Sequence, residues 1–273
     1  MLEALERCAA RWGVDLEAPL NGATCSLVWR GRHGTYGDVV LKTPDPDRCD
    51  FRAAQSAMAL ADFGGVTILG HDPESGSTLM PCLDPGTHLA ESGLSDDEAV
   101  LVVAKLLARI HQAPRYDAIT LEDRMRELWL AESASPMFHR AAEVSKKLLA
   151  TSPAPVLLHG DLHHFNVLRH RDNWLAIDPE SLCGDPAYDI SAFMRNPLGS
   201  LEKGPALKAR SQRRLEGFAR STGHAIERLW GWSFAQTALA ALWAKDDPST
   251  HEEWTRVAQC LDDLRHDMGQ AIS

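Results

Sequence analysis

The sequence predicts an α+β protein in which a small antiparallel sheet precedes a larger, mainly helical region. Short strand-like runs separated by Gly- and Pro-rich turns fill the first part, whereas apolar residues at helical spacing dominate the second part. A segment bounded by proline and glycine at 81–86 separates the two. We therefore predict an N-terminal lobe at 1–82 and a C-terminal lobe at 83–273.

Breakers and capping residues define the individual elements. The strands predicted in the N-terminal lobe are 26–30, 38–42, 66–69 and 77–80. An amphipathic start predicts a helix at 2–12, and an Ala- and Met-rich stretch predicts another at 51–63 that ends at a Gly-Gly pair. Ser95 followed by Glu98 is a capping box that begins a helix reaching about residue 113. The further predicted helices are 121–149, 206–221, 225–245 and 251–268, interrupted by strands and turns between 156 and 190.

Composition restricts the function classes. Apolar residues at 44% and charged residues at 24% are typical of a globular protein. A formal net charge of −10 argues against a nucleic-acid binder, because phosphate contacts need basic clusters, and it is compatible with a cationic small-molecule substrate. The N-terminus lacks a signal-peptide core, and no apolar stretch approaches a membrane span. Six scattered cysteines without a C-x-x-C pair predict reduced thiols and a cytoplasmic location.

The residues that carry chemistry lie in the octapeptide HGDLHHFN at 159–166 and in the Ile-Asp pair that ends at 178. An aspartate, an asparagine five positions later and a further aspartate at a turn form the acid–amide–acid set of phosphoryl-transfer sites. In this pattern Asp161 is the base that accepts the proton of the attacking hydroxyl, while Asn166 and Asp178 are oxygen ligands for Mg²⁺. The pattern predicts a kinase of small molecules.

Other interpretations of this region are weaker. The three histidines of the octapeptide suggest zinc, but His163 and His164 are adjacent, would point in divergent directions and have no cysteine partner. A structural role bridging the loop backbone fits His159 better, and the role of His163 stays open. A hydrolase is disfavoured because no G-x-S-x-G motif is present. A protein kinase is disfavoured because too few residues separate Asp178 from Asp185 for an activation segment.

A nucleotide also needs a cation for its phosphates. Lys42 ends a predicted strand, as does the lysine that contacts the α- and β-phosphates in kinases, although such a lysine is also common in solvent. Its partner is either Asp50, which is equally suited to be a helix N-cap, or the weaker candidate Gln55. Asp185 either braces the catalytic loop through backbone N–H groups or only caps a turn.

These motifs resemble the aminoglycoside phosphotransferase family, whose signature is similar to H-G-D-x-x-x-x-N followed by I-D. The segments 26–29, 159–166 and 174–188, and the Trp-rich helix near the C-terminus, are closest to the streptomycin 6-phosphotransferase and aminoglycoside-hydroxyurea kinase branch. The resemblance implies a bilobal protein-kinase-like fold and MgATP as donor. It also implies that the 80–83 linker, with Met80 and Cys82, holds adenine. By position alone, the small residues at 21–26, ending in Ser26, are candidates to cover the phosphates. Asp50 for glutamate and the aromatic Phe165 are departures from the family pattern.

The acceptor pocket is predicted in the C-terminal helices. Its candidate residues are Asp189, Arg195, Trp243, Asp246 and Asp247. Carboxylates there would pair with guanidinium or ammonium groups of an aminoglycoside, although each residue also fits the solvated face of a helix. We predict ATP-dependent phosphorylation of a hydroxyl of streptomycin or a related aminoglycoside, which confers resistance. The alternatives are a metabolic kinase of a sugar, amino alcohol or hydroxyurea-type substrate, and a pseudokinase. The oligomeric state and the choice between ATP and GTP stay open.

Overall fold

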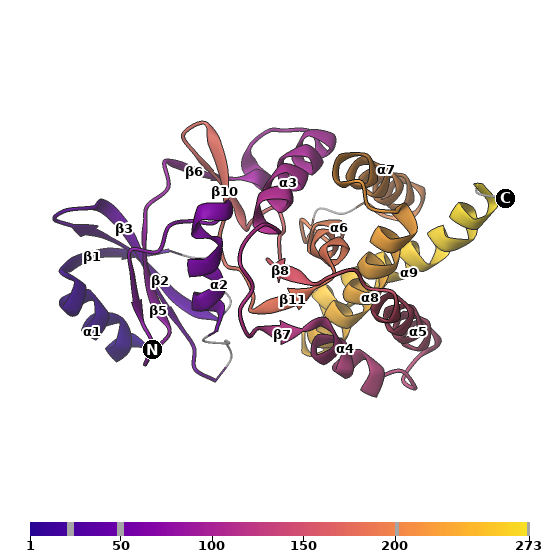
Figure 1. The fold of residues 1–273 in the computed structure, drawn as a ribbon, viewed down its shortest axis with the longest axis horizontal. Coiled ribbons are helices and arrows are strands. Elements are labelled where there is room, and N and C mark those ends of the chain that lie inside the picture. The colour runs from indigo at the N-terminus through magenta and orange to yellow at the C-terminus, as the bar shows by residue number, and fades with distance from the viewer. Residues whose placement is uncertain (21–24, 48–51, 200–201, 272–273) are drawn as a thin grey trace.

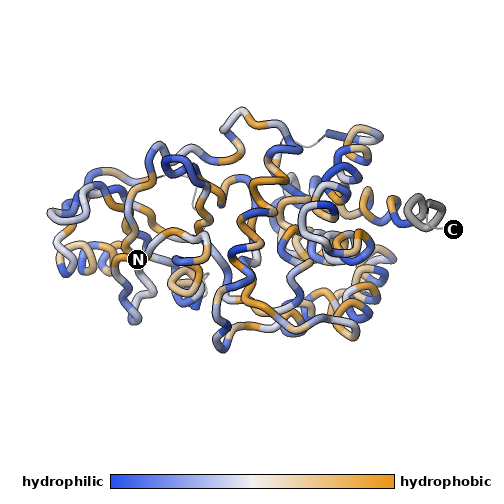
Figure 2. Tube along the Cα trace, turned by 45° about the horizontal axis from the view of Figure 1, so that its top comes forward, coloured by the Kyte–Doolittle hydropathy of each residue, from blue (hydrophilic) through white to orange (hydrophobic). Residues whose placement is uncertain are grey.

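The structure, a computed structural model, describes residues 1–20, 25–47, 52–199 and 202–271. A sheet with two helices forms one end of the molecule, and a cluster of helices forms the other, so the α+β prediction is confirmed (Figure 1). Apolar residues gather along the inner strands and helices, while hydrophilic residues occupy the outward turns (Figure 2). In the described residues no helix combines the length and apolar character that a membrane crossing requires.

The N-terminal sheet has five antiparallel strands in the order β1-β2-β3-β5-β4. Their bounds are β1 Val14–Pro19, β2 Ser26–His33, β3 Gly37–Pro44, β4 Gly70–Asp72 and β5 Ser77–Pro81. Helix α1 (Leu2–Trp12) packs on the face that carries Val39, Leu41 and Leu79. Because side chains alternate along a strand, Lys42 of β3 points to the opposite face.

The C-terminal region is built around one long buried helix, α8 (Ile226–Trp243). Its side chains are buried all round from Leu229 to Ala241, which is why its apolar residues show no single stripe. The other helices are α3 Asp96–Ile110, α4 Leu121–Leu130, α5 Pro136–Ala150, α6 Ser191–Met194, α7 Gly204–Thr222 and α9 Pro248–Ala271. Helices α5, α7 and α9 pack against α8 and form one large apolar core.

Two small sheets hold the chemistry-bearing segment between the two ends of the molecule. One has the order β10-β9-β6 and consists of β6 (Pro85–His88), β9 (Val167–His170) and β10 (Asn173–Ala176). The other has the order β7-β11-β8 and consists of β7 (Ile119–Thr120), β8 (Val156–Leu158) and β11 (Leu182–Gly184). The predicted catalytic loop runs from the end of β8 to the start of β9, so both of its ends are fixed by sheet hydrogen bonds.

Most predicted elements are confirmed, and the differences have local causes. The β2–β3 hairpin, the helix α2 (Ala53–Leu60) and the Ser95 capping box are present. The helix predicted at 121–149 is wrong as one element, because Ser135 caps a new helix that begins at Pro136. The strand predicted at 66–69 is replaced by β4, because the amide of Val66 bonds to the carbonyl of Ala176 instead. The strand β1 was not predicted.

Among the cysteines that the structure describes, one differs from the sequence expectation. Cys8, Cys82, Cys183 and Cys260 are free thiols, but Cys25 is disulfide-bonded, so the prediction that all thiols are reduced is wrong. The lobe boundary at residue 82 stays a prediction. It coincides with the end of β5 at Pro81, from which the chain passes to β6.

Candidate active site

A buried carboxylate braces the start of the catalytic loop. The two oxygens of Asp189 accept hydrogen bonds from the backbone N–H groups of His159 (2.9 Å) and Gly160 (2.7 Å) and from Nε2 of His111 (2.9 Å). Gly160 has a positive φ of 84°, and a Cβ there would lie 2.9 Å from the Cβ of Glu180. Only glycine fits this turn, which is why the motif has Gly before Asp161.

His159 joins the two ends of the loop, as the sequence predicts. Its side chain is fully buried, its Nε2 lies 2.9 Å from the carbonyl oxygen of Ile177, and its Nδ1 accepts a weak bond of 3.4 Å from the amide of Asp161. Burial lowers the pKa of His159, against the opposing charges of Asp189 and Asp161. The neutral ring therefore donates from Nε2, and it fixes the segment after β10 that carries Asp178 beside the loop that carries Asp161.

Asp161 is held as an anion. Its Oδ1 accepts a hydrogen bond of 3.0 Å from Nη2 of Arg195, and its Oδ2 lies 3.4 Å from Nε2 of His163. Burial raises the pKa of Asp161, but the nearby imidazole of His163 and the charge of Arg195 outweigh it and hold this pKa well below its usual range. The side chain keeps 31% of its surface exposed, so a small molecule can reach the carboxylate.

Asn166 and Asp178 supply oxygen atoms next to this anion. The Nδ2 of Asn166 donates to the carbonyl of Asp161 (2.9 Å), which leaves its amide oxygen available, and the amide of Ile177 bonds to the carbonyl of Asn166 (2.9 Å). Asp178 follows with a positive φ of 57°, a strained conformation that turns its carboxylate out of the strand line. One amide oxygen and one carboxylate suit Mg²⁺, which keeps water and phosphate oxygens as its other ligands.

This donor set is small. Among the described residues no cluster of three or more His, Cys, Asp or Glu side chains forms a metal cage. Two protein ligands without thiolate or imidazole disfavour zinc. The residues present fit a metal such as Mg²⁺, whose remaining ligands are water and substrate phosphate oxygens.

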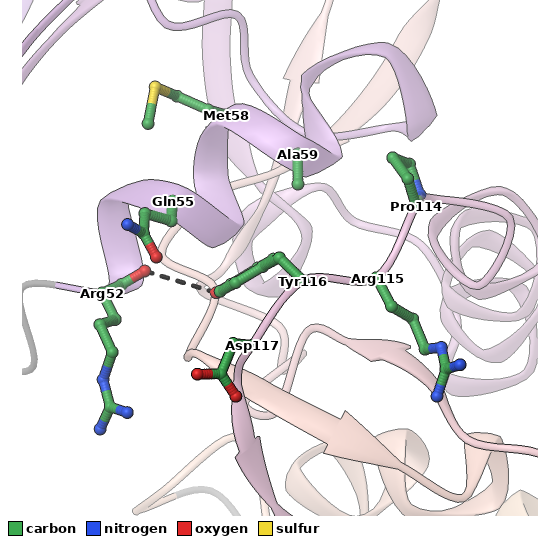
Figure 3. Close-up of a pocket in the computed structure, with 8 residues that line it drawn as sticks. All are labelled: Arg52, Gln55, Met58, Ala59, Pro114, Arg115, Tyr116 and Asp117. Carbon is green, nitrogen blue, oxygen red and sulfur yellow. Dashed lines mark hydrogen bonds between the residues drawn. The ribbon is translucent and has the colours of Figure 1, made fainter.

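Lys42 connects the N-terminal sheet to this set. Its Nζ lies 2.6 Å from Oδ1 of Asp178, across 136 positions of sequence. The candidate partner Asp50 lies outside the described residues. Gln55 is exposed on α2 and lines a cavity of about 640 Å³. Figure 3 shows it on the same side as Met58 and the segment around Tyr116, which also line this cavity. In the described residues the partner of Lys42 is therefore Asp178.

The other predicted nucleotide contacts lie along the sheet and its exit. Ser26 begins β2 opposite Pro44, and Met80 of β5 pairs with Val40. The amide of Cys82 bonds to the carbonyl of Asp38 (2.9 Å), which continues the strand into the linker. The phosphate-covering segment at 21–24 lies outside the described residues. These contacts with a nucleotide stay predictions.

The predicted acceptor residues separate into two groups. Asp189 has no exposed side-chain surface and braces the loop, and Arg195 is 5% exposed and binds Asp161, so neither is free to bind a substrate. Trp243 is 37% exposed, and its indole N–H donates to Glu127 (2.9 Å). Asp246 is exposed in the turn after α8. The role of Trp243 and Asp246 in binding a substrate stays a prediction.

Two other aspartates have capping roles. Asp247 caps α9 through the amides of Ser249 and Thr250, at 3.2 and 3.3 Å. Asp185 caps the turn at Ala187 and binds Arg228 and the indole N–H of Trp232, both at 2.5 Å. The brace expected from Asp185 is thus supplied by Asp189, four positions later.

One further ion pair near the catalytic loop was not predicted. Glu180 lies beside Gly160, is 34% exposed and forms an ion pair of 2.8 Å with Arg124 of α4, whose guanidinium carbon lies 5.4 Å from the centre of the Trp243 ring. Burial and the charge of Asp161 raise the pKa of Glu180, against the effect of Arg124. The spacing of residues along the chain could not predict this pair, because Arg124 and Glu180 lie on separate elements far apart in sequence.

Comparison with known proteins gives a consistent result. The profile of the family described as aminoglycoside/hydroxyurea antibiotic resistance kinase matches residues 11–248. Streptomycin 6-kinase from Streptomyces griseus is 29% identical over 257 residues, which are 89% of this chain and 83% of that protein. Streptomycin 3''-kinase from Klebsiella pneumoniae is 35% identical over 177 residues, covering 62% of this chain and 66% of that protein. Hydroxyurea phosphotransferase from Kitasatospora aureofaciens is 29% identical over 262 residues, covering 87% and 71%.

Solved structures show the same fold at low identity. A choline/ethanolamine kinase family protein from Mesorhizobium loti superimposes with a TM-score of 0.68 at 18% identity, covering 94% of this chain and 92% of that one. A thermostable mutant of aminoglycoside phosphotransferase APH(4)-Ia gives 0.65 at 15% identity, covering 95% and 98%. The protein-kinase-like fold expected from the sequence is confirmed.

Proposed function

The chain belongs to the aminoglycoside/hydroxyurea antibiotic resistance kinase family, and on this premise we propose that it transfers the γ-phosphoryl group of ATP to a hydroxyl of streptomycin or a related aminoglycoside. It is a phosphotransferase, as its relatives are. The observation that carries the finer proposal is the convergence of an ionised Asp161, the amide of Asn166 and the Lys42–Asp178 pair.

The acceptor half of the reaction depends on Asp161. Its exposed carboxylate accepts a hydrogen bond from the acceptor hydroxyl and takes the proton as the O–H bond breaks. The acceptor oxygen then forms its bond to the γ-phosphorus, and the bond to the β-phosphate oxygen breaks to release ADP. Because the pKa of Asp161 is low, the carboxylate orients the hydroxyl in the ground state and receives the proton late, when the acceptor oxygen has lost most of its basicity.

The donor half depends on Lys42, Asn166 and Asp178. Mg²⁺ supplies charge neutralisation on the phosphates when it is bound, and Asn166 and Asp178 would hold it. Lys42 is placed to contact the α- and β-phosphates once a nucleotide competes for its ammonium group with Asp178. The lobes at 1–82 and 83–273 would then enclose the nucleotide, with adenine on the linker at Met80 and Cys82 and the phosphates below Ser26.

The acceptor class is supported by charge. Streptomycin kinases are among the relatives, and the net charge of −10 favours a cation. On the C-terminal side of the site, Glu180 is paired with Arg124, which also lies over the Trp243 ring, so the carboxylate of Glu127 and the remaining exposed surface of Trp243 are the groups left for a cation. Guanidinium groups bind such surfaces through paired hydrogen bonds and cation–π contacts.

Hydroxyurea is a second candidate acceptor, because a hydroxyurea phosphotransferase matches 87% of this chain. It is small and neutral, so it gains nothing from the carboxylates around the site. We also propose a cytoplasmic location, because the reaction consumes ATP, although the disulfide at Cys25 is unusual for that compartment.

A comparison of acceptors tests the assignment. Purified enzyme with MgATP is assayed for ADP release with streptomycin, choline and hydroxyurea as separate acceptors, at low and high salt. We expect turnover with streptomycin and a KM that rises with salt, since screening weakens the attraction of the cation. Faster turnover with hydroxyurea, or a streptomycin KM independent of salt, would overturn the substrate assignment.

A further inference from the structure

We propose that Arg195, held in place by Trp254, is a positioning residue that aims one oxygen of Asp161, Oδ2, at the acceptor hydroxyl. This inference rests on the proposed function, because it assigns an atom-level role within that site. It also replaces the substrate contact expected for Arg195 from the sequence.

Arg195 is shielded from any ligand and fixed on three sides. Its side chain is 6% exposed, and its Nη2 donates to Oδ1 of Asp161 at 3.0 Å. Its Nη1 donates to the carbonyl of Ala192 at 3.3 Å, and its guanidinium carbon lies 4.9 Å from the centre of the Trp254 ring. A guanidinium held by a carbonyl, an aromatic face and a carboxylate has little freedom to move toward a substrate.

This contact makes the two oxygens of Asp161 inequivalent. Oδ1 is engaged by a charged donor at normal hydrogen-bond length, whereas Oδ2 lies 3.4 Å from Nε2 of His163, beyond the usual range. Oδ2 therefore keeps accepting capacity for a ligand. Because a carboxylate rotates about its Cβ–Cγ bond, an anchor on Oδ1 sets the direction in which Oδ2 points.

The anchor comes from parts of the chain far from Asp161 in sequence. Arg195 follows α6, 34 positions after Asp161, and Trp254 lies in α9. Through Arg195 the packing of α9 reaches the catalytic loop. A lysine at this position would keep the charge, but it would lose the planar fork that contacts the carbonyl and the carboxylate together.

The test compares three variants with one control. Arg195→Met removes the donor, Arg195→Lys keeps the charge, and Trp254→Leu removes the stacking face. The control, Arg140→Met, removes an exposed arginine of α5 that pairs with Asp262 on α9. Arg140 has no role in the proposed reaction. Each protein is measured for kcat and for the KM of ATP and of streptomycin, with active enzyme counted by nucleotide binding.

We expect Arg195→Met to lower kcat about 100-fold, because misplacement of a reacting group by about 1 Å has an effect of that size. The KM for ATP should change less than about threefold, because Arg195 contacts Asp161 and none of the residues proposed to bind ATP or Mg²⁺. Arg195→Lys should recover part of kcat, Trp254→Leu should lose several-fold, and Arg140→Met should match the wild type. A purely structural role predicts a reduced fraction of active enzyme with normal kcat per active site.

Two results would overturn the inference. One is wild-type kcat per active site in Arg195→Met, and the other is equal losses of kcat in the Met and Lys variants. If the wild type transfers no phosphate to streptomycin, the proposed function fails instead. The role of Arg195 is then tested by the slow hydrolysis of ATP without acceptor, in which water takes the place of the hydroxyl. A slower hydrolysis in Arg195→Met would support the positioning role, and an unchanged rate would overturn it.

Discussion

Replacing Asp189 with asparagine removes the brace under the catalytic loop. The carboxylate accepts three hydrogen bonds, at 2.7, 2.9 and 2.9 Å, with no exposed surface. Asparagine keeps one acceptor oxygen, but its NH₂ group then faces a donor, so one buried N–H loses its partner. Bonds to a charged acceptor contribute about 1.5–3 kcal/mol each, and an unpaired buried donor costs a similar amount. We therefore expect Asp189→Asn to lower the free energy of unfolding by about 2–4 kcal/mol.

For a chain of 273 residues, with an unfolding entropy of about 2.1 cal/mol/K per residue, that loss lowers Tm by about 3–7 °C. The kcat should fall at least about tenfold, because the loop that carries Asp161 loses its anchor. Thermal unfolding followed by circular dichroism, together with steady-state kinetics, measures both effects. The matched control is Asp172→Asn, whose carboxylate is fully exposed and should leave Tm unchanged. An Asp189→Asn protein that melts with the wild type and turns over normally would refute the brace.

Three further changes test separate parts of the account. Lys42→Met should lower kcat/KM for ATP by about 100-fold, because a cation is removed from the phosphate site; an unchanged value in a coupled ADP assay would contradict this. Asp178→Asn should raise the Mg²⁺ concentration needed for half-maximal nucleotide binding, measured by titration calorimetry, and an unaltered Mg²⁺ requirement would exclude its role as a ligand. Burial, with the charge of Arg214, lowers the pKa of His164 to about 2 from 6.5, so below pH 6.5 only the unfolded chain takes up this proton. The stability that His164 contributes is therefore present above pH 6.5 and falls by about 1.4 kcal/mol per pH unit below it. His164→Phe keeps an aromatic ring against Phe193. Below pH 6.5 this variant should reduce the pH dependence of the free energy of unfolding by about 1.4 kcal/mol per pH unit, measured by urea unfolding of the nucleotide-free protein. An equal pH dependence in wild type and variant would show that His164 does not titrate as described.

The central chemistry was predictable because it is local. Asp161, Asn166 and Asp178 lie on one loop and the β9–β10 hairpin, so their spacing along the chain fixes their neighbours. The contacts that tune them are not local. Arg195 meets Asp161 through the packing of α6 on α8, and Asp189 rather than Asp185 faces the loop because of the turn between them. Residue types alone do not predict contacts between residues so far apart in the sequence.

The fold shows the same division. Hairpins and capped helices were predicted where turn and cap residues act within a few positions, as at Ser95 and in the β2–β3 pair. The strand β1 and the position of β4 depend on partners far along the chain, such as the contact of Val66 with Ala176. Packing decides those elements, because a short strand has little intrinsic stability.

The most direct test of the central claim is the mass of streptomycin after incubation with MgATP and the purified protein, compared between the wild type and Asp161→Asn. We predict that the wild type adds one phosphoryl group to the drug, and that Asp161→Asn binds MgATP but leaves the drug unmodified. Unmodified drug with the wild type would contradict the proposed substrate, and equal modification by both proteins would contradict the role of Asp161 as the base.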